Sequence, residues 1–135
     1  MMHPQIGTHV ARVEGDTLFF HPVGDLNLQE VLEYFKLAEQ VVAQRGGVYF
    51  IDDISKLGSA PPEVRRVAGD WLGHNPCLGV ALYGGSVAAR TIALLVIGVT
   101  RMLGKLSFPI VFVKSEQEAR DWVKAQHRKR AKTQS

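Results

Sequence analysis

Apolar residues change their spacing along this chain, and the changes divide it into strands and helices. Near the N-terminus, residues 9–13 alternate loosely and residues 17–21 are rich in β-forming side chains, with the turn-forming run 14–16 between them. This pattern predicts a β-hairpin. From Leu28 to Val42, apolar residues recur at helical spacing, which predicts the first helix.

Both ends of this first helix have capping signals. Asn27 is a good N-cap, and Glu30, three residues later, completes a capping box. The pair Gly46-Gly47 can supply a left-handed C-cap. We therefore expect the helix to lie between Asn27 and these glycines.

After the first helix, continuous apolar runs alternate with helical patterns. The run 48–52 is typical of a central strand that is buried on both faces, the run 78–83 of a further buried strand, and 108–113 is expected to be the last strand. Three more helices are predicted: one from Pro61 or Pro62 to the Asn75-Pro76 stop, one from Ser86 to Leu103 that closes at Gly104, and one after a capping box of Ser115 and Glu118.

This order predicts a single α/β domain. We expect a mixed sheet of about four to five strands that opens with the hairpin and is parallel at its later strands, with about four helices packed on it. The chain has 135 residues and is 46% hydrophobic, which suits one domain with a real core. Residues 1–127 are expected to form this domain and 128–135 a basic C-terminal tail.

Charge changes this picture only at the C-terminus. The formal net charge of +3 suggests an acidic partner, but four of the 16 basic residues lie in 128–135, which has no acid. The rest of the chain holds 12 basic against 13 acidic residues and is nearly neutral. We therefore expect that any attraction of nucleic acid comes from the charge of the tail, and we expect no specific nucleic-acid site.

The sequence offers no signal for catalysis or for metal binding. Cys77 is the single cysteine, which excludes an internal disulfide and a cysteine-based zinc site and fits a reducing compartment. The histidines are scattered, and no nucleophile–base pair is recognisable by spacing. The chain begins without a signal-peptide pattern, and its apolar runs are too short for a transmembrane segment. We expect a cytoplasmic protein that is not an enzyme and needs no cofactor or metal.

Asp52 and Asp53 follow the central apolar run. Paired carboxylates can share a proton or bind a metal. Adjacent residues of a strand point to opposite faces, however, so we expect these two side chains to diverge and to serve turns.

Three stretches resemble the SpoIIAA-like STAS family, the anti-sigma-factor-antagonist fold. They are the strand, acids and loop of 48–55, the helix and strand of 67–83, and the ending 108–113 followed by Glu118-Ala119-x-x-Trp122-Val123. The resemblance covers roughly 8–126 and is nearest to the branch grouped with Sec14-like lipid-binding proteins. It implies a SpoIIAA-like fold and a regulatory function through binding.

In sporulation-type members of that family, a partner kinase phosphorylates a serine at the start of the helix after the central strand. The resemblance makes Ser59 the candidate here, with Ser55 as a weaker one, although Gly58 replaces the acid of the family motif. A phosphate at a helix N-terminus would be stabilised by free N–H groups. The alternative is an ordinary N-cap or loop serine.

A glycine-rich junction is a candidate site for a ligand or an anion. Gly84, Gly85 and Ser86 lie between a strand and a helix, and Arg90 follows one turn into that helix. Ligands of α/β proteins favour such strand ends. A plain tight turn is the alternative, because the known phosphate-binding glycine patterns are absent.

The third helix is apolar on all sides. Arg90, Arg101 and Lys105 share one face with Val87, Leu94 and Ile97, while the opposite face is assigned to the core through Ile92, Leu95, Val96, Val99 and Leu103. Either internal packing or another molecule must cover the first face. Arg90, Leu94, Ile97 and Arg101 are the candidate partner interface.

Two functions follow from these patterns. The first is a non-enzymatic, STAS-like regulatory module. It would bind a partner protein, such as an anti-sigma-type kinase, or self-associate as a homodimer through its second and third helices. The alternative is a carrier or sensor of a lipid or another small apolar molecule, because the third helix is apolar and the resemblance includes lipid-binding proteins.

Overall fold

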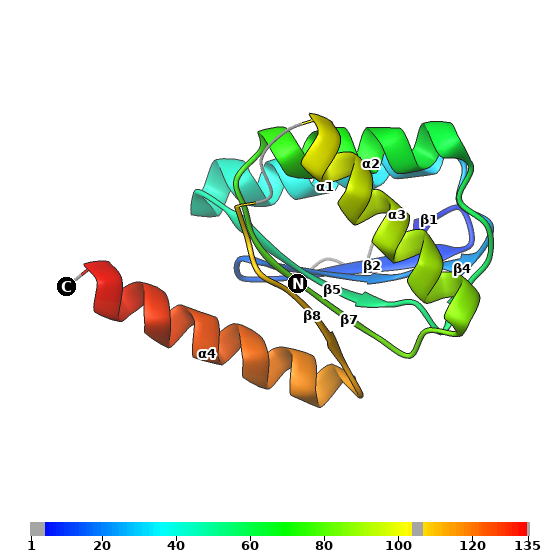
Figure 1. Ribbon diagram of the computed structural model, residues 1–135. Helices are drawn as coiled ribbons and strands as arrows, with labels where there is room; N and C mark the ends of the chain where they lie inside the picture. Colours follow the sequence, from blue (N-terminus) through cyan, green and yellow to red (C-terminus); the bar gives the residue numbers. More distant parts are fainter. Residues whose placement is uncertain (1–4, 104–106, 135) are drawn as a thin grey trace.

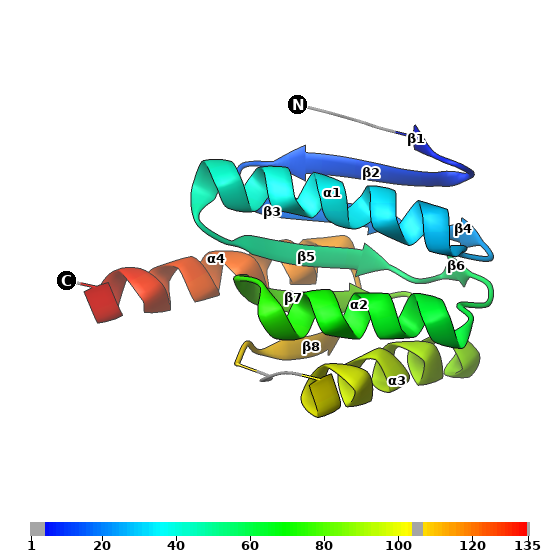
Figure 2. The same cartoon turned by 90° about the horizontal axis from the view of Figure 1, so that it is seen from above.

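The computed structural model describes residues 5–103 and 107–134, and it places helices on both faces of one central sheet (Figures 1 and 2). Helices α1, α2 and α3 cover one face, and α4 lies against the other. In chain order the elements are β1 (Gln5–Ile6), β2 (His9–Glu14), β3 (Thr17–His21), β4 (Val23–Gly24), α1 (Leu28–Arg45), β5 (Val48–Asp53), β6 (Lys56–Leu57), α2 (Pro62–His74), β7 (Cys77–Tyr83), α3 (Val87–Leu103), β8 (Ile110–Val113) and α4 (Glu116–Gln134).

The central sheet has six strands in the order β1-β2-β3-β5-β7-β8. The first three strands pair antiparallel, and β3, β5, β7 and β8 pair parallel. The α/β class, the leading hairpin and the four helices are confirmed. The expected four to five strands were too few, because β1 extends the sheet and β4 pairs with β6 in a separate small sheet. Strands of two residues are too short to show a periodicity in the sequence.

Helix α1 has the caps that its sequence predicts. The Asn27 side chain accepts a hydrogen bond from the Glu30 N–H at 2.9 Å, and the Glu30 carboxylate accepts one from the Asn27 N–H at 2.9 Å. Gly46 ends the helix in the left-handed conformation, with φ of 83°. The predicted capping box and C-cap are therefore confirmed.

The main core lies between the sheet and helices α1, α2 and α3. Aromatic rings stack in its centre: Phe20 lies 4.1 Å from Tyr34, and Phe35 lies 4.9 Å from Trp71, between ring centroids. Phe50 of the central strand β5 contacts both Phe35 and Trp71 edge-on. These contacts fix α1 and α2 over the sheet.

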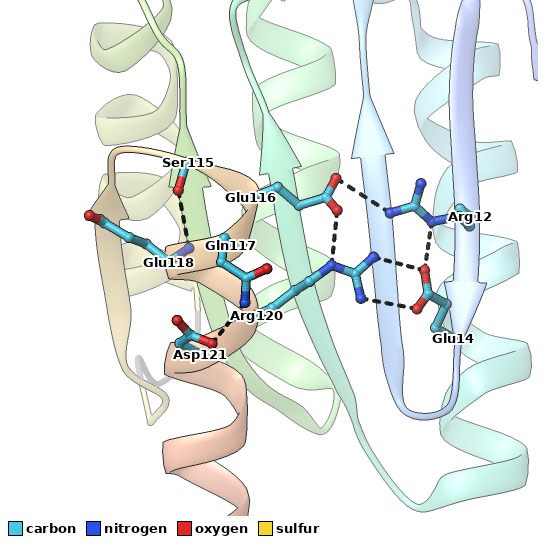
Figure 3. A network of polar contacts seen from close by, with 8 residues as sticks. All are labelled: Arg12, Glu14, Ser115, Glu116, Gln117, Glu118, Arg120 and Asp121. Atoms are coloured by element: carbon cyan, nitrogen blue, oxygen red, sulfur yellow. Dashed lines mark hydrogen bonds and ion pairs between the residues drawn. The ribbon is translucent and has the colours of Figure 1, made fainter.

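Helix α4 is held on the opposite face by a smaller core and by a network of charges. Arg120 donates to both oxygens of Glu14 at 3.1 and 3.0 Å, and its Nε donates to Glu116 at 2.9 Å (Figure 3). The guanidinium groups of Arg12 and Arg120 each lie 4.4 Å from the centroid of the Phe19 ring. The hydrogen bonds from Arg120 are the largest cause of the lowered pKa of Glu14.

The start of α4 forms half of the expected capping box. The Ser115 hydroxyl accepts from the Glu118 N–H at 3.1 Å, but the Glu118 carboxylate accepts from the Lys114 N–H and not from that of Ser115. The helix then continues to Gln134, so the basic segment is helical up to that residue. Within the described part of the chain, no helix has the length and apolar character needed to cross a membrane.

Candidate functional site: an apolar cavity with a partly buried carboxylate

A cavity of about 130 Å³ lies between the sheet and helices α1, α2 and α3. Its walls are almost entirely apolar, and side chains from both layers form them, among them Phe20, Phe50, Val64, Leu82, Ile92 and Ala93. An apolar cavity of about 150 Å³ in another protein stays dry and binds benzene. The volume here therefore suits one small ring or a short branched chain.

Asp52 brings a carboxyl group to this apolar wall. Side chains of β5 alternate between the two faces of the sheet, so Phe50 and Asp52 face the helices α1, α2 and α3. Asp53 pairs on its own side with His21, whose Nδ1 lies 2.8 Å from the carboxylate. The prediction that the two acids diverge is confirmed, but Asp52 does not serve a turn.

The Tyr34 hydroxyl donates a hydrogen bond to Asp52 Oδ1 at 3.4 Å. Among the described residues it is the one hydrogen bond of the Asp52 side chain. Burial raises the pKa of Asp52 from 3.8 to about 7, and the Tyr34 hydrogen bond opposes this rise. Burial also raises the pKa of Tyr34 well above its usual value, with a further contribution from Asp52. Near neutral pH, Asp52 is thus a mixture of acid and carboxylate.

The other polar groups on the cavity wall already have partners. Thr100 donates to the Val96 carbonyl at 2.9 Å, and Arg65 donates to the Ala60 carbonyl at 2.7 Å. Asp52 is the one acidic side chain that the described residues bring to this wall, and its single hydrogen bond leaves most of its acceptor sites unused. A ligand with a hydrogen-bond donor could use it.

Helix α3 forms one wall of the cavity and packs closely on α2. A Cβ atom at Gly69 of α2 would lie 2.5 Å from Val99 Cγ1 and 2.9 Å from the Thr100 backbone nitrogen, so the absence of a side chain permits this contact. Ile97 lines the cavity and is partly buried, so of the two alternatives for this residue the structure shows internal packing. Leu95, which was assigned to the core, is 46% exposed. A helix that is apolar on all sides does not reveal which stripe packs inward.

The outer face of α3 exposes apolar side chains between positive charges. The exposed fractions are 84% for Val87, 57% for Leu94 and 76% for Met102. Arg90 and Arg101 are exposed as well, and α3 contains no acidic residue. Gly104 and Lys105, which were predicted at the end of this helix and on this face, lie outside the described residues.

The glycine junction before α3 has the geometry of a turn and a cap. Gly84 adopts a left-handed conformation with φ of 79°, and Gly85 lies against the Ile54 side chain. The Ser86 hydroxyl accepts from the Ala89 N–H at 3.2 Å. The Arg90 guanidinium lies 5.1 Å from the centroid of the Phe112 ring. The tight-turn alternative accounts for all four residues, and anion binding there stays a prediction.

Ser59 lies before α2 but does not cap it. The N-cap of α2 is Pro61, which makes no side-chain hydrogen bond, so the N-cap interpretation of Ser59 was wrong. The Ser59 N–H donates to Asp25 at 2.8 Å, and hydrogen bonds from Ser59 lower the pKa of Asp25. A phosphate on Ser59 would therefore lie close to a carboxylate that repels it. Ser55 is exposed, and its N–H donates to Asp53 at 3.1 Å.

The cavity and the Tyr34–Asp52 pair were not predicted from the sequence. One signal was present, since an acid ended an apolar run of the kind that is buried on both faces. A group of three or more potential metal ligands does not occur among the described residues. In comparisons with known proteins, no family model matches this chain, and no curated protein matches it.

Proposed function

We propose that this protein binds a small apolar molecule in the cavity and does not transform it chemically. The observation that supports this function is an apolar cavity whose wall holds a carboxyl group with one long hydrogen bond. Placing such a group in apolar surroundings costs stability, and the long hydrogen bond from Tyr34 offsets only part of that cost. A ligand that pairs with Asp52 would offset this cost.

The volume of the cavity limits the size of the ligand. At about 130 Å³, the cavity is well below the several hundred Å³ of sites for drug-sized molecules. A single ring, or the end of an acyl chain, matches it better than a whole lipid. The similarity to the Sec14-like branch supports the apolar class of ligand, and both the family and a cytoplasmic location remain part of the proposal.

Binding of benzyl alcohol, measured by calorimetry, tests this function. The variant Ala93→Leu adds three carbon atoms at the cavity wall and should abolish binding while the melting temperature stays the same or rises. Ala88→Leu makes the same change on the exposed side of α3 and should bind as the natural sequence does. Equal binding by both variants, or no binding by the unmodified protein, would exclude the cavity as the site.

A second function is supported by the outer face of α3. We propose that this face docks an apolar segment with acidic residues from a partner protein, as a STAS-like regulatory module would. The exposed side chains of Val87, Leu94 and Met102 need a cover, and Arg90 and Arg101 complement acids. If a second copy docked on this face about a two-fold axis, the arginines of the two copies would repel each other.

An acidic amphipathic peptide with a leucine stripe is the probe for this second function. We expect binding that weakens with salt and that Leu94→Glu combined with Leu95→Glu abolishes. The matched control is Leu32→Glu, because Leu32 of α1 is half-exposed as well. Equal binding by the double variant and the control would refute the proposal. A dimer in light scattering that the double variant alone disrupts would also refute it, because the occupant would be a second copy.

A further inference from the structure

The polar end of the cavity indicates the chemical class of its ligand. We infer that the ligand is a small apolar amine, bound as the ammonium ion, with Asp52 as its counter-charge. This inference rests on the proposed ligand-binding function and goes beyond it, because an apolar ligand need not carry a charge.

Among the described residues, no cationic side chain forms an ion pair with Asp52. The titratable groups near it are Tyr34 of α1, Cys77 of β7 and, on the same cavity wall, Arg65 of α2. Arg65 donates to the Ala60 carbonyl and does not contribute to the charge balance of Asp52. Helix α3, β3 and β8 bring no titratable side chain to the wall within the described chain. A carboxylate in apolar surroundings is costly until a cation joins it.

The hydrogen-bond acceptors around Asp52 also match the donors of an ammonium group. Asp52 Oδ1 accepts from Tyr34, while Asp52 Oδ2 has no protein partner among the described residues. The Tyr34 oxygen keeps a lone pair for a further hydrogen bond. An ammonium group has three N–H donors and could reach both oxygens, whereas an alcohol has one. Aromatic rings of Phe20 and Phe50 on the wall also favour a cation.

Proton linkage supports the same class of ligand. Without a ligand, Asp52 favours its protonated form more than a free carboxyl group does, because burial raises its pKa to about 7. An ammonium ligand favours the carboxylate instead, so its binding should expel a proton below that pH. We therefore expect the affinity for an amine to rise from pH 5.5 to pH 8 and to change little for a neutral ligand.

Calorimetry with benzylamine and benzyl alcohol, two ligands of nearly the same shape, tests this inference. At pH 7.5 we expect the unmodified protein to bind benzylamine roughly ten- to a hundredfold more tightly than benzyl alcohol. In Asp52→Asn, which keeps the size of the side chain, this preference should disappear while benzyl alcohol still binds. Asp53→Asn is the matched control, because its carboxylate lies on the opposite face of the sheet, and it should keep the preference.

The outcomes separate this inference from the proposed function. Equal affinity for the two ligands, or a preference for benzylamine that Asp52→Asn retains, overturns the amine class and leaves an apolar ligand site. No binding of either ligand to the unmodified protein overturns both. An affinity for benzylamine that does not rise between pH 5.5 and pH 8 also contradicts the assignment of Asp52 as the counter-charge.

Discussion

Tyr34 of α1 and Asp52 of β5 meet at the wall of an apolar cavity, where the tyrosine hydroxyl donates to Asp52 Oδ1 at 3.4 Å. This hydrogen bond is long, and it compensates only part of the cost of burying a carboxyl group. Groups that cost stability persist in proteins chiefly where function needs them. The pair is therefore the centre of our account.

Replacing Asp52 by asparagine should stabilise the protein in a pH-dependent way. Because the pKa of Asp52 is raised to about 7 in the folded chain, the folded state holds a proton between about pH 4 and pH 7 that the unfolded state releases. Stability from this group is complete below pH 4 and is lost as the pH rises to 7. We expect Asp52→Asn to unfold with a free energy roughly 2–4 kcal/mol higher at pH 8 and nearly unchanged at pH 4. Urea unfolding at both pH values would show this, and an equal difference at both would contradict it.

Removing the Tyr34 hydroxyl should raise the pKa of Asp52 above 7. The hydrogen bond from Tyr34 favours the carboxylate, so Tyr34→Phe leaves only the effect of burial. A carbon-13 NMR titration of the aspartate carboxyl groups measures this shift directly. Tyr83→Phe alters a tyrosine on the opposite side of the sheet and should leave the Asp52 titration unchanged. A pKa of Asp52 that falls in Tyr34→Phe would be inconsistent with the geometry.

Two glycines of the α2–α3 pair should respond oppositely to alanine. A methyl group at Gly69 would collide with Val99 and with the backbone of Thr100, so we expect Gly69→Ala to cost about 1–3 kcal/mol. A methyl group at Gly98 of α3 would have no neighbouring atom within 4 Å. Gly98→Ala should therefore stabilise the protein by roughly 0.5–1 kcal/mol through helix propensity. Chemical unfolding of the two variants tests this. A stabilised Gly69→Ala would mean that α3 does not pack on α2 as described.

The bidentate pair of Arg120 and Glu14 should stabilise the attachment of α4. Both side chains are partly exposed, so we expect Arg120→Met to cost only about 1 kcal/mol. High salt should reduce this difference. Arg128→Met removes an exposed charge from the same helix and should cost less than half as much. Equal losses of stability in the two variants would show that the ion-pair network does not stabilise the attachment of α4.

The fold could be predicted from the sequence where a local rule applies. The capping box of Asn27 and Glu30 defines the start of α1, and the apolar run 48–52 identifies a strand buried on both faces. The orientation of α3 could not be predicted, because its sequence is apolar all round and its packing on α2, which is closest at Gly69, determines which stripe faces inward. The site was missed for a similar reason: Tyr34 and Asp52 lie on different elements, and their meeting depends on how α1 packs on β5.

The most direct test of the cavity as a ligand site is the detection of nuclear Overhauser effects between benzyl alcohol and methyl groups of the protein. We expect contacts from the ring of the ligand to methyl groups of Val64, Leu82 and Ile92, which line the cavity. We expect none to Val111 or Val123, which pack on the side of α4. Contacts confined to exposed methyl groups such as those of Val87 and Leu94, with none in the cavity at saturating ligand, would contradict the account.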